Sequence, residues 1–332
     1  MSCAGVNNMK KNFHIVTDGT IERHENTIYF VNAVGKRPLP VENISQISCH
    51  GSITVTSQAL HLFSKAGIVI HFFNYYGFYD GSFYPRECLL SGDLLVRQAE
   101  YYLDSGKRLC LAKKFVEGAI SNMRKTIADY KISGKDEALA GFSREVPDAR
   151  DITGLMNVEA RARIEYYDCF DQILTGELHY EKRTRQPPEN EINAMISFGN
   201  SLLYSTVLCE LYNTQLNPTI AYLHEPGERR FSLCLDISEL FKPMIVDRLI
   251  IYLVNKRVIQ KEDFRKDLNG IMFTDNGKKK FLKYYEEKLQ TTIKHRGLRR
   301  SVSYQRLIRL EAYKLIKHLI GVKDYKPFVL WW

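Results

Sequence analysis

The spacing of apolar residues changes along the chain, from a strand-like pattern in the first ninety residues to a helical pattern in the remainder. Residues 13–31 are rich in β-branched and aromatic side chains and are interrupted at Asp18-Gly19 and at Glu25-Asn26. Because such pairs commonly form tight turns, both breaks are predicted to be β-hairpin turns. Further strands are expected over three short segments, residues 41–48, 52–56 and 67–73.

One short helix is expected within this strand-rich region. Its apolar residues share one face of residues 57–66, and Gly67 is placed to end the helix as a C-cap. The aromatic run at residues 71–84 invites a role in stacking on nucleic-acid bases. We interpret it instead as β-domain core and dimer packing, because aromatic residues are enriched in strands and interfaces.

Beyond Ser91 the apolar residues recur at helical spacing. Four segments carry this pattern and are expected to be helices: residues 93–130, 190–212, 244–255 and 301–320. Residues 133–147, rich in Gly, Asp, Glu and Ser, are interpreted as a flexible link between two helices. The predicted fold is therefore α+β, with a small N-terminal β domain at residues 1–88 and a larger all-α domain at residues 89–332.

The ends of the chain and its cysteines exclude several classes of protein. Residues 1–8 have no periodicity and are interpreted as a disordered tail or as the product of a start upstream of Met9. The longest apolar runs fall short of the roughly 20 residues that span a bilayer, and no secretion signal is present. A cytoplasmic protein without membrane contact is expected. The seven cysteines form no C-x-x-C pair, which argues against structural zinc and a disulfide scaffold.

The charge balance favours a polyanionic partner. The 332 residues include 47 Lys and Arg against 38 Asp and Glu, a formal charge of +9. Residues 277–320 carry 13 Lys and Arg against 3 Glu, so the surplus is densest there. Part of this segment is expected to follow a DNA backbone, whereas roughly half of its basic residues fit an ordinary solvated helix face.

Glu159 is the first candidate for metal chemistry. It lies beside the apolar face of residues 154–167, whose pattern is helical, and a helix would aim its carboxylate toward the interior. A buried carboxylate needs a cation, a metal ion or a raised pKa. Arg163 follows four residues later, so a simple i,i+4 ion pair is the alternative.

Two later segments carry further hard ligands. His224 ends an apolar run just before a Pro-Gly turn, where it is either a ligand or a packed, hydrogen-bonded histidine. Asp236 and Glu239 are three residues apart and therefore neighbours on a helix, where two carboxylates repel unless a cation lies between them. Alternatively, Asp236 caps the helix and Glu239 occupies its N3 position.

This set of ligands indicates a particular class of metal. One histidine with two or three carboxylates suits Mg²⁺ or Mn²⁺ with open coordination positions, because oxygen ligands dominate. In a basic protein such a metal indicates phosphodiester chemistry, in which it polarises the phosphate and activates an attacking hydroxyl. No phosphate-binding loop of the G-x-x-x-x-G-K-[ST] type is present, so no nucleotide cofactor is expected.

The chain resembles a known family in three motifs, which are Leu155-Met-Asn-Val-Glu159, Leu216 to His224, and Ser232 to Pro243 with Val246-Asp-Arg248. They are similar to motifs of Cas1, the CRISPR adaptation integrase and endonuclease, in its type I (I-B-like) form. The resemblance covers nearly the whole chain from Met9. It implies a short β domain followed by an α-helical domain that holds a divalent-metal site.

The resemblance also implies a set of roles and partners. Glu159, His224 and Glu239 would be the ligands of Mg²⁺ or Mn²⁺, and Asp236 would be a nearby catalytic carboxylate. A homodimer would join a small Cas2-type protein and capture short double-stranded DNA, the protospacer. A 3′-OH of that DNA would attack a phosphodiester of the CRISPR repeat, and the same site would cleave DNA when water is the nucleophile.

Seven basic residues are expected to contact the DNA. They are Arg163, Lys242, Arg248, Lys294, Arg296, Arg299 and Arg300. The alternative function is a non-catalytic DNA-binding scaffold of the same fold, which substitution of the three ligands would distinguish. A nuclease that processes RNA is not supported, because no RNA-recognition motif is present.

Overall fold

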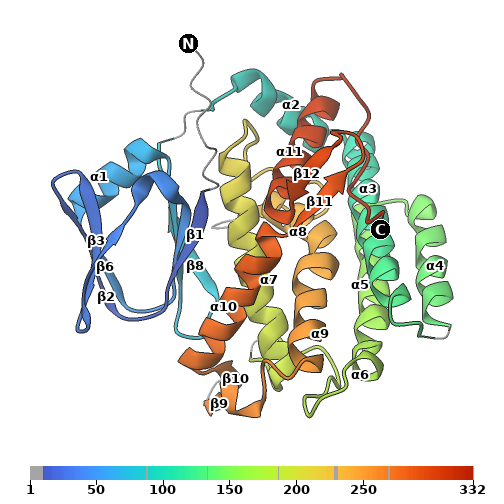
Figure 1. The fold of residues 1–332 in the computed structure, drawn as a ribbon. Helices are drawn as coiled ribbons and strands as arrows, with labels where there is room; N and C mark the ends of the chain where they lie inside the picture. Colours follow the sequence, from blue (N-terminus) through green and yellow to red (C-terminus); the bar gives the residue numbers. More distant parts are fainter. Residues whose placement is uncertain are drawn as a thin grey trace. The chain divides into compact units, whose positions relative to one another are not determined.

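The structure is a computed structural model that describes residues 10–86, 89–132, 134–185, 187–227, 231–267 and 270–331. The chain divides into two compact units, Met1–Cys88 and Leu89–Trp332. Strands dominate the first unit and helices dominate the second (Figure 1). The α+β fold class predicted from the sequence is therefore confirmed.

The first unit contains two four-stranded sheets. One has the order β1 (Lys11–Ile15), β5 (Ile44–Cys49), β7 (Val69–Phe73) and β8 (Tyr79–Phe83), with only the β7–β8 pair antiparallel. The other has the order β4 (Gly35–Leu39), β3 (Thr27–Asn32), β2 (Gly19–His24) and β6 (Ile53–Val55), with β6 parallel to β2. A 3-10 turn, η1 (Val41–Asn43), precedes β5.

The two breaks predicted as hairpin turns have different outcomes. Glu25-Asn26 joins the antiparallel strands β2 and β3, as predicted. Asp18-Gly19 does not form a hairpin, because β1 pairs with β5 in one sheet while β2 pairs with β3 and β6 in the other. The chain changes sheets at this point, where Asp18 Oδ1 accepts a 2.7 Å hydrogen bond from the Ser52 amide.

A single helix and both sheets share the apolar core of this unit. Helix α1 (Ser57–Ala66) begins after Thr56 and ends at Gly67, whose φ of 66° lies in the left-handed region that favours glycine. Phe63 of α1 packs in one cluster with Ile21 of one sheet and Ile47 of the other, and all three are fully buried. The predicted helix and its C-cap are therefore confirmed.

The buried histidine of β7 predicts a pH dependence of stability in this unit. His71 is fully buried between Ser82 and Gln46, and burial, aided by the charge of His14, lowers its pKa to about 3. Below about pH 6.5 the imidazole of His71 binds a proton in the unfolded chain but not in the folded chain. The free energy of unfolding therefore falls as the pH drops below about 6.5, by up to about 1.4 kcal/mol per pH unit. Hydrogen exchange of β7 between pH 7 and 4.5 measures the slope.

Two substitutions isolate this contribution from that of the carboxylates. His71→Gln should flatten the pH dependence, because glutamine has no proton to gain. His61→Gln, at an exposed position of the same unit, should leave it unchanged. An identical slope in wild type and His71→Gln would show that His71 does not carry the effect.

The helical unit is built mainly from long helices. They are α2 (Gly92–Leu103), α3 (Ser105–Ala128), α4 (Lys135–Glu145), α5 (Ile152–Asp168), α6 (Phe170–Ile173), α7 (Glu191–Tyr212), α8 (Ser232–Phe241), α9 (Arg248–Asn255), α10 (Asp275–Gln290) and α11 (Tyr304–Leu319). A π-helical segment, η3 (Lys242–Asp247), joins α8 to α9, and two 3-10 turns lie at η2 (Val146–Asp148) and η4 (Lys261–Asp263).

This unit is not entirely helical, which corrects the all-α expectation for it. Two antiparallel hairpins interrupt the helices, β9 (Phe264–Asp267) with β10 (Gly270–Phe273), and β11 (Thr292–His295) with β12 (Arg300–Ser303). Each strand has only four residues, and the second hairpin is strongly charged. Their alternation of apolar and polar residues is therefore too short to indicate a strand in the sequence.

Residues 135–145 form helix α4, so the prediction of a flexible link at residues 133–147 is wrong over most of its length; residue 133 lies outside the described residues. Asp136 of α4 accepts two hydrogen bonds from Arg124 of α3, at 2.8 and 2.9 Å, and Leu139 is fully buried. Tertiary contacts stabilise a helix that its local composition does not indicate.

The helix predicted at residues 244–255 begins within the π-helical segment η3 and is α-helical only from Arg248. Two other predicted helices have different bounds because of capping side chains. The segment at residues 93–130 breaks at Asp104, which ends α2 and caps α3 by accepting a 2.9 Å hydrogen bond from the Lys107 amide. The segment at residues 301–320 begins in strand β12, and Ser303 caps α11. In both cases a polar side chain captures a free backbone amide and sets the start of the helix.

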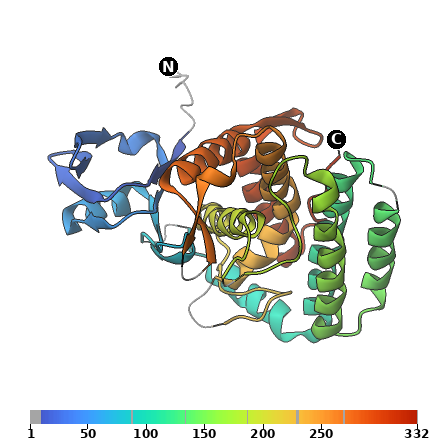
Figure 2. The same ribbon diagram turned by 90° about the horizontal axis from the view of Figure 1, so that it is seen from below.

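Helix α7 is the central helix of this unit, and Figure 2 shows it enclosed by the other helices. It is the one helix among the described residues that is long and apolar enough to cross a membrane, but 83% of the relevant window is buried inside the protein. Such burial is typical of a core helix. The five described cysteines form no disulfide with one another, and four of them are buried; Cys3 and Cys88 lie outside the described residues.

Candidate metal centre

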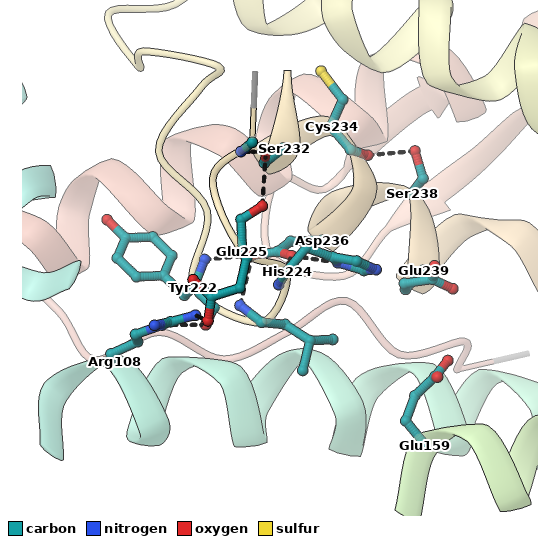
Figure 3. Close-up of polar contacts among 12 residues, drawn as sticks. Arg108, Glu159, Tyr222, His224, Glu225, Ser232, Cys234, Asp236, Ser238 and Glu239 are labelled. Carbon is teal, nitrogen blue, oxygen red and sulfur yellow. Dashed lines mark hydrogen bonds and ion pairs between the residues drawn. The ribbon is translucent and has the colours of Figure 1, made fainter. Parts of the chain in front are cut away.

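Three elements of the helical unit carry the three predicted ligands. Glu159 lies in α5, Glu239 lies in α8, and His224 lies in the segment that joins α7 to α8. Figure 3 shows the carboxylates of Glu159 and Glu239 pointing toward the same space, with the imidazole of His224 near Glu239. The fold therefore brings together side chains that are far apart in the sequence.

A guanidinium group lies between the two carboxylates. Arg163 follows Glu159 by one helical turn; its Nε donates to Glu159 Oε1 at 2.8 Å, and its Nη2 contacts both Glu159 Oε1 and Glu239 Oε2. The side chains of Arg163, Glu159 and Glu239 are 13%, 16% and 7% exposed, so solvent screens their charges weakly. The i,i+4 ion pair proposed as the alternative for Glu159 is present, and it extends to a third residue.

A second cation contacts one of these two carboxylates, that of Glu239. Lys242, in the segment after α8, places its Nζ 2.6 Å from Glu239 Oε1. Burial raises the pKa of Glu239, but the charges of Arg163, Lys242 and His224 together outweigh it and lower the pKa to about 2. Glu239 is therefore ionised at every physiological pH, and the centre contains two carboxylates matched by two cations.

Asp236 holds His224 in place. Asp236 is fully buried, and α8 begins four residues before it, at Ser232, so the alternative in which Asp236 caps the helix is wrong. Its Oδ2 accepts from the Tyr222 and Leu223 amides at 2.7 and 3.0 Å, and its Oδ1 accepts from the His224 amide at 3.0 Å and contacts His224 Nδ1 at 2.8 Å. These contacts occupy both carboxylate oxygens, which gives Asp236 a positioning role.

The contact with Asp236 also defines the state of His224. It occupies Nδ1 and leaves Nε2 as the ring nitrogen that could bind a ligand, an arrangement typical of metal-binding histidines. Burial lowers the pKa of His224, but the hydrogen bond that His224 donates to Asp236 and the charges of Asp236 and Glu239 outweigh it, so the pKa is raised above its usual value. The hydrogen-bonded histidine that the sequence allowed is present, and it remains compatible with a ligand role.

Two residues that the sequence analysis missed hold the segment around His224 against the long helices. Arg108 of α3 donates to the Tyr222 carbonyl at 3.0 Å and to Glu225 Oε1 at 2.6 Å. Tyr102 of α2 donates to Glu225 Oε2 at 2.9 Å. These partners are more than a hundred residues apart in the sequence, and no local pattern indicates the contact.

The donor set of this centre fits a hard divalent cation. Two carboxylates share the guanidinium of Arg163, which contacts an oxygen of each, so positive charge is accepted between them, and the imidazole of His224 lies near Glu239. Within the part of the chain that the structure describes, no three His, Cys, Asp or Glu side chains are grouped closely enough to hold a metal at once. Glu159 and Glu239 share Arg163 rather than direct contact with each other.

The seven basic residues predicted to contact DNA fall into two groups. Arg163 and Lys242 contact the carboxylates of the centre, and Arg248 forms a 2.6 Å ion pair with Asp129. The other four occupy the β11–β12 hairpin, where all are exposed; they are Lys294, Arg296, Arg299 and Arg300. Arg296 donates to the Trp331 carbonyl, and none of the four forms an ion pair with a described residue.

The rest of the basic segment is partly neutralised within the protein. Three of its members form ion pairs with buried carboxylates: Lys280 with Asp263, Arg309 with Glu210, and Lys314 with Glu311. These three charges are balanced by buried carboxylates. Of the exposed cations that remain in the segment, four lie close together in sequence on the hairpin, whereas Lys279, Lys283 and Lys317 lie on α10 and α11.

Comparison with known proteins identifies close relatives. The family model described as CRISPR associated protein Cas1 matches residues 13–287. The chain is 58% identical to the CRISPR-associated protein Cas1 1 of Methanobrevibacter ruminantium, over 97% of this chain and 99% of the relative. It is 56% identical to the CRISPR-associated endonuclease Cas1 of Pyrococcus horikoshii, again over 97% of this chain and 99% of the relative.

A solved structure supports the same relationship. The Cas1 protein from Thermotoga maritima is similar with a TM-score of 0.90 and 42% sequence identity, and the match covers 95% of this chain and 99% of that one. The likeness therefore extends over the β unit, the helical unit and all the elements that carry the candidate metal centre.

Proposed function

Because this chain belongs to the Cas1 family of CRISPR-associated proteins, we propose that it is a metal-dependent DNA integrase and endonuclease. It joins the 3′-OH ends of short duplex DNA to phosphodiesters of a CRISPR repeat, and it cleaves DNA when water replaces the 3′-OH. The observation that carries this proposal is that Glu159 and Glu239 already share one cation, Arg163, and that the imidazole of His224 lies near Glu239.

The residues of the centre have distinct roles in this reaction. Glu159, Glu239 and His224 would hold Mg²⁺ or Mn²⁺, which when bound polarises the scissile phosphate and lowers the pKa of the attacking hydroxyl. Asp236 holds Nδ1 of the His224 ring, which leaves Nε2 to bind the metal. Lys242 keeps a positive charge beside Glu239, where it offsets the negative charge of an approaching phosphate.

Duplex DNA, a second copy of the chain and a small Cas2-type protein are the proposed partners. Family membership supports all three. For DNA, the exposed hairpin adds four unpaired cations, which suit sequence-independent contact with phosphates. The apolar and aromatic residues of the β unit are proposed to pack in the homodimer, as expected from the sequence.

Removing the metal tests the proposal. By microscopic reversibility, the centre should also resolve a branched DNA that mimics the integration product, releasing one arm with a 3′-OH. We expect this reaction with Mg²⁺ or Mn²⁺, a loss of at least about 100-fold in rate with EDTA, and recovery when Mn²⁺ is added back.

A separate binding measurement on the same branched DNA distinguishes the alternative function. Binding without any reaction in Mg²⁺ or Mn²⁺ would indicate the non-catalytic scaffold. A reaction rate that EDTA leaves unchanged would contradict the metal-dependent mechanism.

A further inference from the structure

Arg163 occupies the place where the proposed metal centre needs a divalent cation. Its Nη2 contacts one oxygen of Glu159 and one oxygen of Glu239, and these are two of the three ligands proposed above. The two helices α5 and α8 thus meet through a buried cation supplied by the chain itself. A divalent ion and a guanidinium cannot contact the same carboxylate oxygens without strong repulsion, because both are positive and water is scarce there.

A buried carboxyl group lies close to Arg163 and has an oxygen that could form an ion pair with the guanidinium. Asp247, at the end of the π-helical segment, is 1% exposed, and its Oδ1 accepts a long, 3.4 Å hydrogen bond from the Tyr167 hydroxyl. Its Oδ2 has no hydrogen-bond partner among the described residues; the Tyr166 hydroxyl is near but outside hydrogen-bond geometry. A buried carboxyl oxygen without a partner is costly and is rarely retained without a role.

The spacing of Arg163 and Tyr167 on α5 places the carboxyl group of Asp247 near the Arg163 side chain. Tyr167 follows Arg163 by four residues, so the two side chains are neighbours on one face of the helix, and Tyr167 contacts Asp247 directly. Burial raises the pKa of Asp247 to about 7, and Arg163 is the largest charge that opposes this rise. Lys242 also acts on Asp247, but its Nζ is held by Glu239.

We propose that Arg163 is an internal counter-ion that occupies the metal centre before metal binds and transfers to Asp247 when a divalent cation enters. This inference rests on the proposed metal centre and adds a regulation of its occupancy. In the metal-free protein, Arg163 prevents the buried Glu239 and the part-buried Glu159 from repelling each other. In the metal-bound protein, Asp247 forms an ion pair with the displaced guanidinium. Arg163 can then leave the two carboxylates without becoming an unpaired charge inside the protein.

The test is a titration of the purified protein with Mn²⁺, followed by the electron paramagnetic resonance signal of free Mn²⁺. Arg163→Met removes the competing cation, so we expect Mn²⁺ to bind at least about fivefold more tightly than to wild type. The metal-free variant should melt at a lower temperature than wild type, and its melting temperature should rise more when Mn²⁺ is added. Arg161→Met, at an exposed arginine of the same helix, is the matched control and should bind Mn²⁺ like wild type.

A double-mutant cycle tests the role of Asp247. Asp247→Asn removes the charge that receives Arg163, so Mn²⁺ binding should weaken about fivefold in the presence of Arg163. The same substitution should have no effect on Mn²⁺ binding in the Arg163→Met background. If Arg163→Met folds only when Mn²⁺ is present, that result also supports the exchange, because the metal then replaces the missing counter-ion.

Three outcomes would overturn the exchange, and they can be told apart. Equal or weaker Mn²⁺ binding by Arg163→Met, with normal binding by wild type, would show that Arg163 supports the ligands rather than competing for them. Additive effects of Arg163→Met and Asp247→Asn would show that Asp247 does not receive the guanidinium. Absence of Mn²⁺ binding in both wild type and Arg163→Met would overturn the metal centre itself, and the exchange with it.

Discussion

Glu239→Gln is expected to abolish DNA strand transfer, with the rate on branched DNA falling at least about 1,000-fold in Mg²⁺. The substitution nearly preserves the volume of the side chain but removes the negative charge that Arg163 and Lys242 contact. A neutral amide is a poor ligand for a hard divalent cation, and it leaves the charges of both basic residues less well balanced. Single-turnover kinetics with saturating DNA measures the effect on the chemical step.

Glu165→Gln is the matched control for this substitution. Glu165 also lies in the helical unit and forms a part-buried ion pair, with Lys135 at 2.6 Å, and this pair does not include any residue of the centre. It should retain the wild-type rate within about threefold. Circular dichroism and melting temperatures of both variants show whether each remains folded. A folded Glu239→Gln protein that keeps more than a tenth of the wild-type rate would remove Glu239 from the metal centre.

Reversing the charge of the four basic hairpin residues should weaken duplex DNA binding by at least about 100-fold near 0.1 M salt. The substitutions are Lys294→Glu, Arg296→Glu, Arg299→Glu and Arg300→Glu, all at exposed positions of β11, β12 and the turn between them. Each phosphate contact that is lost should reduce the slope of log affinity against log salt by about 0.9, because fewer counter-ions are released on binding.

A second set of four substitutions separates position from net charge. This set changes the total charge by the same amount at exposed sites that run from the end of α9 into β9. The substitutions are Lys256→Glu, Arg257→Glu, Lys261→Glu and Lys266→Glu. If the hairpin is the DNA contact, this set should reduce affinity far less and leave the salt slope close to wild type. Equal losses of affinity in the two sets would mean that the basic character of the whole protein, rather than the hairpin, determines DNA binding.

The elements that the sequence predicts well are those whose apolar spacing is strong and local. Helix α1 with its C-cap Gly67, and the long helices α5 and α7, follow from side-chain periodicity and from caps that lie within a few residues. Helix α4 does not, because the contacts that stabilise it, such as that of Asp136 with Arg124, come from another helix. The turn at Asp18-Gly19 likewise depends on which sheet each neighbouring strand joins.

The contacts of the candidate site also fall into those that the sequence predicts and those that it does not. The pair Glu159 and Arg163 follows from helical spacing alone, but the contact of Arg163 with Glu239 joins residues 76 positions apart. Family resemblance supplied the ligand set, and the structure adds what surrounds it: Asp236 behind His224, and the buried Asp247 beside Arg163. Such contacts between distant helices arise only when the chain packs, and no pattern within one segment indicates them.

The most direct test of the metal centre is the electron spin echo spectrum of Mn²⁺ bound to the full-length protein. If His224 is a ligand through Nε2, the echo of wild-type protein should be modulated by one directly bound imidazole nitrogen. His224→Gln should lose this modulation, whereas His318→Gln, at a histidine of α11, should retain it. A spectrum without nitrogen modulation in wild type, or with unchanged modulation in His224→Gln, would contradict the assignment of Glu159, His224 and Glu239 as the metal centre.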